Sequence, residues 1–313
     1  MKTLFNAALL LVVLSAPFAG CRDNVESERV AWSTMGTIAA IQTKGDRDGV
    51  KSGKLLATTM SIFKDVETLL NAHKPDSEIS RLAPFSDEQV LQQCAHATMP
   101  CYEAAFSLAK ATGGAFNPRW RGEGTLDLGA IAKGFAVDLA CDDLAGEATD
   151  IQCLVDLGGN VKAVRGSWKT GVKNPNGEGF SAVVDLQEGE ALATSATYFR
   201  GSHIFDGRTN KPVVNDIASV TVLCRSAMWA DGLSTALFVL GIDEGRRFLE
   251  GGMHLPDAAG EASALWILKD GRKVFYPASA TNRFTSPGSV PKCSVVAPLF
   301  ICLFRVICLF RAR

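Results

Sequence analysis

The chain has 313 residues, of which 47% are hydrophobic, and its 32 Lys and Arg nearly balance its 33 Asp and Glu. This composition is typical of a globular protein with a substantial core, and it excludes a disordered or collagen-like chain. The formal net charge of −1 gives no sign of the clustered cationic surface that nucleic-acid binding requires. A small-molecule ligand is therefore the first expectation.

Residues 1–20 have the features of a signal peptide. Lys2 precedes a short apolar stretch, 7–14, which is followed by small residues. The stretch is too short for a permanent membrane-spanning helix, which takes roughly 20 apolar residues. Because Cys21 follows a small-residue end that resembles a bacterial lipobox, we expect it to be lipidated. The protein would then be exported and anchored on the periplasmic side of the inner membrane; ordinary cleavage with a free Cys21 thiol is the alternative.

Periodicity in the body of the chain predicts two helices and several short strands. Apolar residues recur every three or four positions over 55–70, and a similar stretch, 101–111, stops at a Thr-Gly-Gly sequence. Short β-branched segments bounded by turn residues predict strands at 37–42, 153–156, 161–164, 182–186, 219–223, 264–268 and 273–276. Helices and strands come in blocks and do not alternate strictly, which favours an α+β fold with mainly antiparallel sheets.

The nine cysteines include no Cys-x-x-Cys pair, which argues against a zinc site. An oxidising compartment would permit a disulfide between Cys94 and Cys101 or between Cys141 and Cys153. Buried free thiols are equally compatible with the sequence, so both alternatives stay open.

Residues 126–138 combine a glycine-containing turn with the start of an apolar helix. Helix N-termini favour anions, so the early backbone groups and Lys133 could bind a phosphate. The spacing matches neither a Walker loop nor a dinucleotide fingerprint. The alternative is an ordinary capped helix from which Lys133 reaches into solvent.

Two further segments have turn-rich sequences that suit a ligand site. In 156–160, paired glycines after a strand would allow a ligand or another strand to approach the backbone, although a plain turn explains them as well. In 191–212, His203 and Asp206 could form a proton-transfer pair, because imidazole titrates near working pH and a carboxylate can orient it. A histidine that caps a hairpin is the alternative. A Ser-His-Asp hydrolase is not supported, because no G-x-S-x-G sequence is present.

Residues 227–241 place Asp231 and Thr235 four positions apart, so on a helix their oxygens share one face. The surrounding residues are nearly all apolar, and an isolated carboxylate is costly to bury. A hard cation such as Mg²⁺, which takes oxygen ligands, would offset this cost. The alternative is that Asp231 faces water while Thr235 bonds back to a helix carbonyl.

Residues 293–313 form an apolar tail in which one five-residue sequence occurs twice, at 301–305 and 307–311. This period fits no straight amphipathic helix. A tail anchor is one interpretation, but Pro298 and Arg305 argue against it. We interpret the tail as a non-native extension and expect one domain over 21–292.

Taken together and in this order, several segments resemble motifs of the ApbE family of FAD:protein FMN transferases. Residues 33–37 are similar to the family's opening strand motif, and 112–118 resemble T-x-G-A-F-D-P. Residues 76–82 follow the first predicted helix, as the corresponding segment does in the family. Residues 127–138 are similar to D-L-G-G-I-A-K-G-Y, 193–195 and 203–206 to A-T-S-G and H-I-x-D-P-R-T-G, and 227–241 to A-D-x-x-x-T-A-x-x-x-x-G. The resemblance extends over residues 30–276.

The resemblance implies an ApbE-like fold, with mainly antiparallel sheets and packed helices in one large two-lobed domain. It also implies transfer of FMN from FAD to a Thr or Ser of an extracytoplasmic flavoprotein of electron transport, with release of AMP. Asp231, Thr235 and the carbonyl of Ala130 would hold Mg²⁺ against the FAD pyrophosphate, and His203 and Asp231 would be the catalytic residues. The implied FAD-binding residues are Met35, His73, Asp127, Lys133, Thr194, Ser195, His203 and Asp206.

The chain departs from the family motifs at a few of these positions. His73 stands where relatives carry an aromatic residue against the isoalloxazine, Ala196 replaces a glycine, Phe199 replaces an acidic residue, and 118–126 is shorter. An FAD pyrophosphatase, in which water replaces the acceptor hydroxyl, and a flavin-binding lipoprotein without turnover are the two alternative functions.

Overall fold

The computed structural model describes residues 12–13, 27–147, 149–197, 204–251, 261–289 and 295–296. Cys21, His203 and most of residues 1–20 and 293–313 lie outside these ranges. The predictions of lipidation at Cys21 and of His203 as the base therefore stay predictions.

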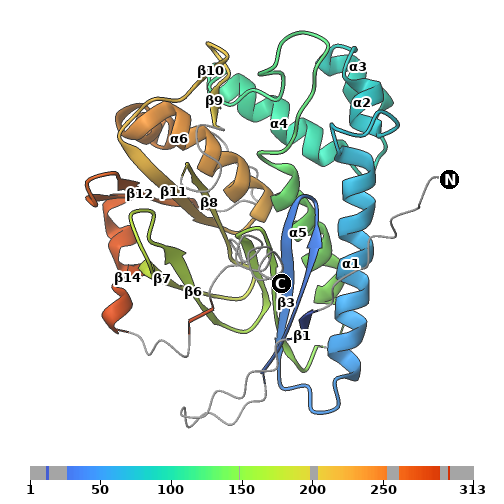
Figure 1. Ribbon diagram of the computed structural model, residues 1–313, viewed down its shortest axis with the longest axis vertical. Coiled ribbons are helices and arrows are strands. Elements are labelled where there is room, and N and C mark those ends of the chain that lie inside the picture. The colour runs from blue at the N-terminus through green and yellow to red at the C-terminus, as the bar shows by residue number, and fades with distance from the viewer. Residues whose placement is uncertain are drawn as a thin grey trace, which may run out of the picture.

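One nine-stranded sheet forms the centre of the molecule, and every neighbouring pair of its strands is antiparallel (Figure 1). In spatial order its strands are β1 (Val12–Val13), β2 (Ser27–Thr34), β3 (Thr37–Lys44), β4 (Gln152–Leu157), β5 (Asn160–Arg165), β8 (Ala191–Ala196), β11 (Ile217–Cys224), β12 (Ser263–Leu268) and β13 (Lys273–Tyr276). A three-stranded sheet contains β6 (Trp168–Lys173), β7 (Phe180–Leu186) and β14 (Phe284–Thr285), and a small hairpin contains β9 (Phe205–Asp206) and β10 (Lys211–Pro212).

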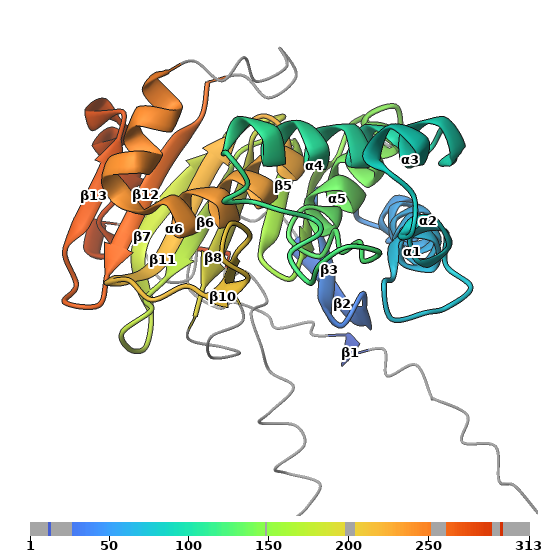
Figure 2. The same ribbon diagram turned by 90° about the horizontal axis from the view of Figure 1, so that it is seen from above.

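Helices cover one face of the large sheet. The helices α1 (Val50–Leu70), α5 (Ala132–Ala145) and α6 (Ala227–Glu250) lie on its strands. The helix α2 (Glu78–Leu82) packs on α1, α4 (Met99–Ala111) packs on α6, and α3 (Asp87–Gln93) packs on α4. Short 3₁₀ turns at Ala278–Asn282 and Pro287–Ser289 lie beside the strands of the three-stranded sheet. Figure 2 shows α1, α5 and α6 side by side along the sheet, where α5 packs on β4 and β5 and α6 packs on β8 and β11. The three-stranded sheet packs on the opposite face.

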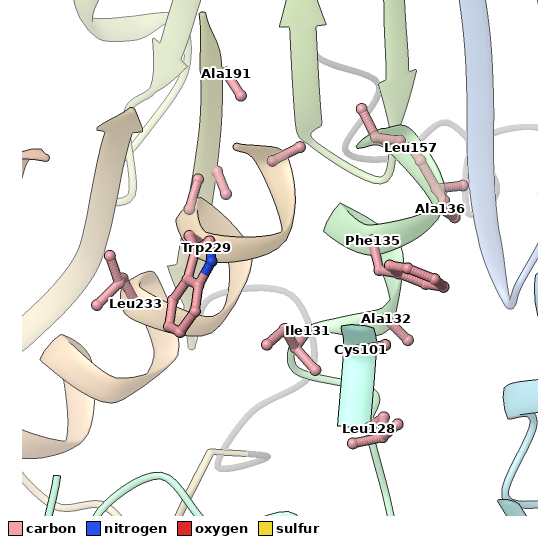
Figure 3. Packing of buried hydrophobic residues seen from close by; sticks show 14 of the residues in the cluster. Cys101, Leu128, Ile131, Ala132, Phe135, Ala136, Leu157, Ala191, Trp229 and Leu233 are labelled. Atoms are coloured by element: carbon pink, nitrogen blue, oxygen red, sulfur yellow. The ribbon is translucent and has the colours of Figure 1, made fainter. Parts of the chain in front are cut away.

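Alternation along the central strands explains why the protein has two hydrophobic cores. On β11, Val220 and Val222 point into the core under the helices, whereas Leu223 points into the core under the three-stranded sheet. Successive strand side chains point to opposite faces, so a sheet covered on both sides is apolar on both. Figure 3 shows the helix-side core, where Ile131 at the start of α5 lies near Trp229 and Leu233 of α6.

The predicted α+β class with mainly antiparallel sheets is confirmed. Every predicted strand lies inside or coincides with an observed one, and the two predicted helices correspond to α1 and α4, which begin earlier than expected. Among the strands longer than two residues, β2, β6 and β8 were not predicted. The sequence of β8, Ala-Leu-Ala-Thr-Ser-Ala, contains few residues that favour strands. It forms a strand because it is buried in the middle of the sheet.

The described cysteines are free thiols, so of the two alternatives, disulfides or free thiols, the structure has the free thiols. Burial raises the pKa of Cys153 and of Cys224 to about 12, and it also raises that of Cys141. Thiols in such surroundings are unreactive at neutral pH. Within the described ranges, no helix has both the length and the apolar character needed to cross a membrane.

Candidate functional site

A cavity of about 680 Å³ opens where the start of α5, the first turns of α6, the strand β8 and the β2–β3 turn come together. Its size is in the range that suits a cofactor-sized ligand. Among the residues predicted for the site, the cavity is lined by Met35, His73, Asp127, Ala130, Lys133, Thr194, Ser195, Asp231 and Thr235. The structure therefore gathers residues from distant parts of the chain into one site.

Asp231 lies on α6 but its carboxylate caps the start of α5. The residue as a whole is only 6% exposed. Oδ2 of Asp231 accepts hydrogen bonds from the backbone N of Gly134 at 3.0 Å and from Nζ of Lys133 at 3.4 Å. A carboxylate is stabilised at a helix N-terminus by the unpaired N–H groups and the helix dipole. The alternative in which Asp231 faces water therefore does not describe this structure.

Thr235 follows Asp231 by one helical turn and lies beside a hydroxyl of β8. The Oγ1 of Thr235 is 2.9 Å from Oγ of Ser195, which is also 2.8 Å from Oγ of Ser234. The bond back to a helix carbonyl is made by Ser234, whose Oγ donates to the carbonyl oxygen of Asp231 at 2.9 Å. The Thr235 hydroxyl is thus held at the cavity surface by β8.

Lys133 does not extend into solvent. Its Nζ donates to the carbonyl oxygen of Gly129 at 2.7 Å, so the ammonium is folded back over the turn that precedes α5. Gly129 in turn donates its backbone N–H to Oδ1 of Asp127 at 2.9 Å, and Oδ2 of Asp127 pairs with Arg121 at 3.3 Å. The carboxylate of Asp127 thus shapes this turn, and the turn places one cation at the N-terminus of α5.

Arg121 and an aromatic pair were not predicted as site residues. The rings of Trp120 and Phe205 stack with centroids 4.3 Å apart, and the guanidinium of Arg121 lies over Trp120 at 4.7 Å. All three line the cavity. The two rings are 85 positions apart in the sequence, so only the folded chain brings them together; an Arg and a Trp beside the 112–118 motif were the only local signal.

Met35 occupies an unusual backbone conformation at the cavity edge. Its φ is 48°, and that of Gly36 is 68°, so both residues of the β2–β3 turn have positive φ. Such a turn matches the twist of a hairpin, but it is strained for a residue larger than glycine or asparagine. A strained non-glycine residue at a cavity is a sign of a functional position.

Asp206 does not line the cavity. Its carboxylate accepts hydrogen bonds from Nε, Nη2 and the backbone N of Arg208, and Arg208 also pairs with Glu244 of α6. The hydrogen bonds from the Arg208 side chain and backbone hold the pKa of Asp206 below its usual value. In this structure Asp206 therefore fastens the β9–β10 hairpin, and its predicted role in binding FAD stays a prediction.

The donor set around Asp231 suits a magnesium ion that is shared with a substrate. Within the described ranges, no cluster of three or more His, Cys, Asp and Glu residues is present. Mg²⁺, however, is usually held by one or two carboxylates together with substrate phosphates, and does not need an all-protein cage. Among the described residues, Oδ1 of Asp231 has no hydrogen-bond donor, and the hydroxyl of Thr235 and the carbonyl of Ala130 belong to residues of the same cavity. These oxygens fit the ion.

Comparisons with known proteins show what this chain is similar to. The ApbE family model matches residues 35–124 and 119–256. The FAD:protein FMN transferases of Vibrio cholerae and Haemophilus influenzae are each 27% identical to this chain, over 90% and 78% of it and over 97% and 89% of their own lengths. The solved structure of the flavin transferase ApbE from Vibrio cholerae has a TM-score of 0.68 at 23% identity, and covers 83% of this chain and 99% of that one. This likeness supports the fold.

Proposed function

Since the chain belongs to the ApbE family, we propose that it transfers FMN from FAD to a Thr or Ser hydroxyl of a target flavoprotein and releases AMP in a Mg²⁺-dependent reaction. One observation carries this proposal: Lys133, Asp231 and Thr235 meet in a single cavity at the N-terminus of α5. Such a site suits a diphosphate, because a helix N-terminus and an ammonium both favour an anion, and the carboxylate can share a cation with it.

The reaction is a phosphoryl transfer, for which positioning and charge stabilisation supply most of the catalysis. The acceptor hydroxyl oxygen forms a bond to the FMN phosphorus, the bond from that phosphorus to the bridging oxygen breaks, and AMP leaves with the electron pair. The hydroxyl proton passes to a base, for which His203 is our candidate from the sequence. When bound, Mg²⁺ would stabilise the negative charge that develops on the phosphate oxygens.

The described residues have distinct parts in this scheme. Lys133 presents its ammonium beside the phosphates, while the bond to Gly129 restricts its range of positions. Ser195 holds the Thr235 hydroxyl in place. The stack of Trp120 on Phe205 forms part of the cavity wall.

We also propose export, a lipid anchor at Cys21 and an extracytoplasmic flavoprotein of electron transport as the acceptor. The support is the sequence of residues 1–21 and the type of reaction. Replacing Cys21 with Ser should move the protein from the membrane fraction to the soluble periplasmic fraction of the expressing cell. An unchanged membrane fraction would contradict the lipid anchor.

Incubation with FAD, Mg²⁺ and a purified acceptor domain separates the proposed transfer from its alternatives. Transfer gives FMN bound covalently to the acceptor together with AMP. A pyrophosphatase gives free FMN and AMP with an unmodified acceptor. A flavin-binding protein without turnover retains FAD and releases no AMP, and either of the last two results would contradict the proposal.

A further inference from the structure

Each of the helices α5 and α6 has a carboxylate that caps the N-terminus of the other. Asp231 of α6 accepts the backbone N–H of Gly134 in the first turn of α5. In the opposite direction, Asp138 of α5 accepts the backbone N–H groups of Ala227 and Met228 in the first turn of α6, each at 2.9 Å. Each helix therefore supplies an N-terminal cap to the other.

Asp138 is bound more extensively than a simple cap requires. Its Oδ2 also accepts a hydrogen bond from Oγ of Ser226 at 2.6 Å, and its Oδ1 accepts one from Nζ of Lys162 at 2.7 Å. The side chains of Asp138 and Lys162 are only 16% and 13% exposed. Hydrogen bonds to an ionised group in such surroundings are short, directional and strong, so they define the rotation of α6 about its own axis.

The two helices are also in close contact at this point. A Cβ added at Gly134 would lie 2.1 Å from the carbonyl oxygen of Ala227. The backbone of α5 therefore rests directly on the first turn of α6. The hydrogen bonds of Asp138 and this close contact both lie where α5 meets the first turn of α6.

The rotation of α6 matters because Asp231 and Thr235 share one face of it. Each residue of an α-helix turns the chain by about 100°, so a slip of one residue would direct both side chains away from the cavity. The contribution of Asp138 is distinct from that of Asp231 itself, because Asp138 is not among the residues that line the cavity.

We infer that Asp138 is a positioning residue, which sets α6 so that Asp231 and Thr235 face the Ala130 turn at the spacing needed to hold a divalent cation against a diphosphate. The inference rests on the proposed function and extends it to a residue outside the cavity. Asp138 acts through the backbone of α6 and touches neither substrate nor cation.

The test compares Asp138→Asn with Glu78→Gln in the full chain. Glu78 is a buried carboxylate at the start of α2 that accepts the backbone N–H of Ala95 and the hydroxyl of Thr98, and it does not line the cavity. Asp138→Asn removes a charge that accepts two backbone N–H groups, a hydroxyl and the Lys162 ammonium, whereas Glu78→Gln removes one that accepts a single backbone N–H and a hydroxyl. Both variants should lower the unfolding temperature, and only Asp138→Asn should change the cation site.

The readout is binding of Mn²⁺ to the FAD-loaded protein, measured from the electron paramagnetic resonance signal of free Mn²⁺ well below the unfolding temperature. We expect Asp138→Asn to weaken Mn²⁺ binding ~10-fold, as loss of a group that orients a ligand typically does, and excess Mg²⁺ to restore turnover. Glu78→Gln should leave Mn²⁺ binding unchanged. Equal Mn²⁺ affinity in wild type and Asp138→Asn would overturn the inference.

Ser226→Ala provides a milder variant if Asp138→Asn does not fold. It removes the hydrogen bond from Ser226, the N-cap residue of α6, to Asp138, together with the bond that the same hydroxyl accepts from the backbone N–H of Trp229. Both backbone bonds from α6 to Asp138 stay in place. A weaker but measurable loss of Mn²⁺ affinity would support the inference, and an unchanged affinity would overturn it. If the wild-type protein with FAD binds no Mn²⁺, the proposed function itself fails; if it does bind Mn²⁺, failure of the variants affects only the role of Asp138.

Discussion

Nζ of Lys133 lies 3.4 Å from Oδ2 of Asp231, so an ammonium on α5 and a carboxylate on α6 are paired across the mouth of the cavity. The pair is largely buried, with side-chain exposures of 26% and 8%. The same oxygen, Oδ2, also accepts the backbone N–H of Gly134. Among the described residues no donor contacts Oδ1, so that oxygen is available to a ligand.

Replacing Asp231 should separate catalysis from stability. Asp231→Ala leaves the N–H of Gly134 without its acceptor, which costs roughly 1–3 kcal/mol of unfolding free energy. Asp231→Asn can keep that hydrogen bond but lacks the charge that a cation requires. We expect both variants to lose Mg²⁺-dependent release of AMP from FAD, and only the Ala variant to lose most of this stability. Unchanged AMP release in either one would remove Asp231 from the site.

Thr235→Val should weaken the response to Mg²⁺ with little loss of stability. The variant keeps the shape of the side chain and removes its oxygen, while Ser195 retains Ser234 as a partner at 2.8 Å. The Mg²⁺ concentration for half-maximal AMP release should rise ~10-fold, and Thr235→Ser should restore it. The ligand assignment is wrong if the Val and Ser variants have the same Mg²⁺ dependence.

Two glycine-to-alanine changes should have opposite effects on stability. At Gly134 the new methyl group would meet the carbonyl oxygen of Ala227 at 2.1 Å, and such overpacking costs about 1–3 kcal/mol or more. At Gly53 on α1 no atom lies within 4 Å, so Ala should stabilise the helix by ~0.5–1 kcal/mol. Urea unfolding of the two variants measures both effects, and a neutral Gly134→Ala would show that the helix contact is not tight.

Acid should remove the contribution that Asp206 makes to the free energy of unfolding. Hydrogen bonds from Arg208 lower the pKa of Asp206 in the folded protein, so its contribution is complete above the unfolded-state pKa, about 3.9. It is lost as the pH falls through the lower folded-state pKa. Asp206→Asn should therefore be less stable than wild type at pH 7, and the difference should shrink toward pH 3. A difference independent of pH would contradict this role of the Arg208 bonds.

Local patterns predicted the parts of the site that depend on neighbours in the sequence. Asp231 and Thr235 lie one turn apart, so their common face follows from helix geometry alone, and Lys133 follows from the start of α5. The motif resemblance added Met35 and His73, whose place in the same cavity no local pattern indicates. The pairing of Asp206 with Arg208 is also local, whereas the sequence predicted His203, which lies outside the described residues, as the partner of Asp206.

Contacts between distant segments could not be predicted in this way. The stack of Trp120 on Phe205 requires that a loop after α4 meets the β9–β10 hairpin. The hydrogen bonds of Asp138 require that α5 and α6 cross at Gly134, and nothing in either helix sequence specifies its partner. The strand β8 was missed for a related reason, since its position in the middle of the sheet, and not its own residues, makes it a strand.

A crystal structure with FAD and Mn²⁺, in which anomalous scattering locates the ion, is the most direct measurement. We expect a Mn²⁺ peak at about 2 Å from a carboxylate oxygen of Asp231, the hydroxyl of Thr235 and the carbonyl oxygen of Ala130, with FAD phosphate oxygens completing the coordination. A peak that is bound elsewhere, or an Asp231 carboxylate directed away from the FAD phosphates, would contradict it.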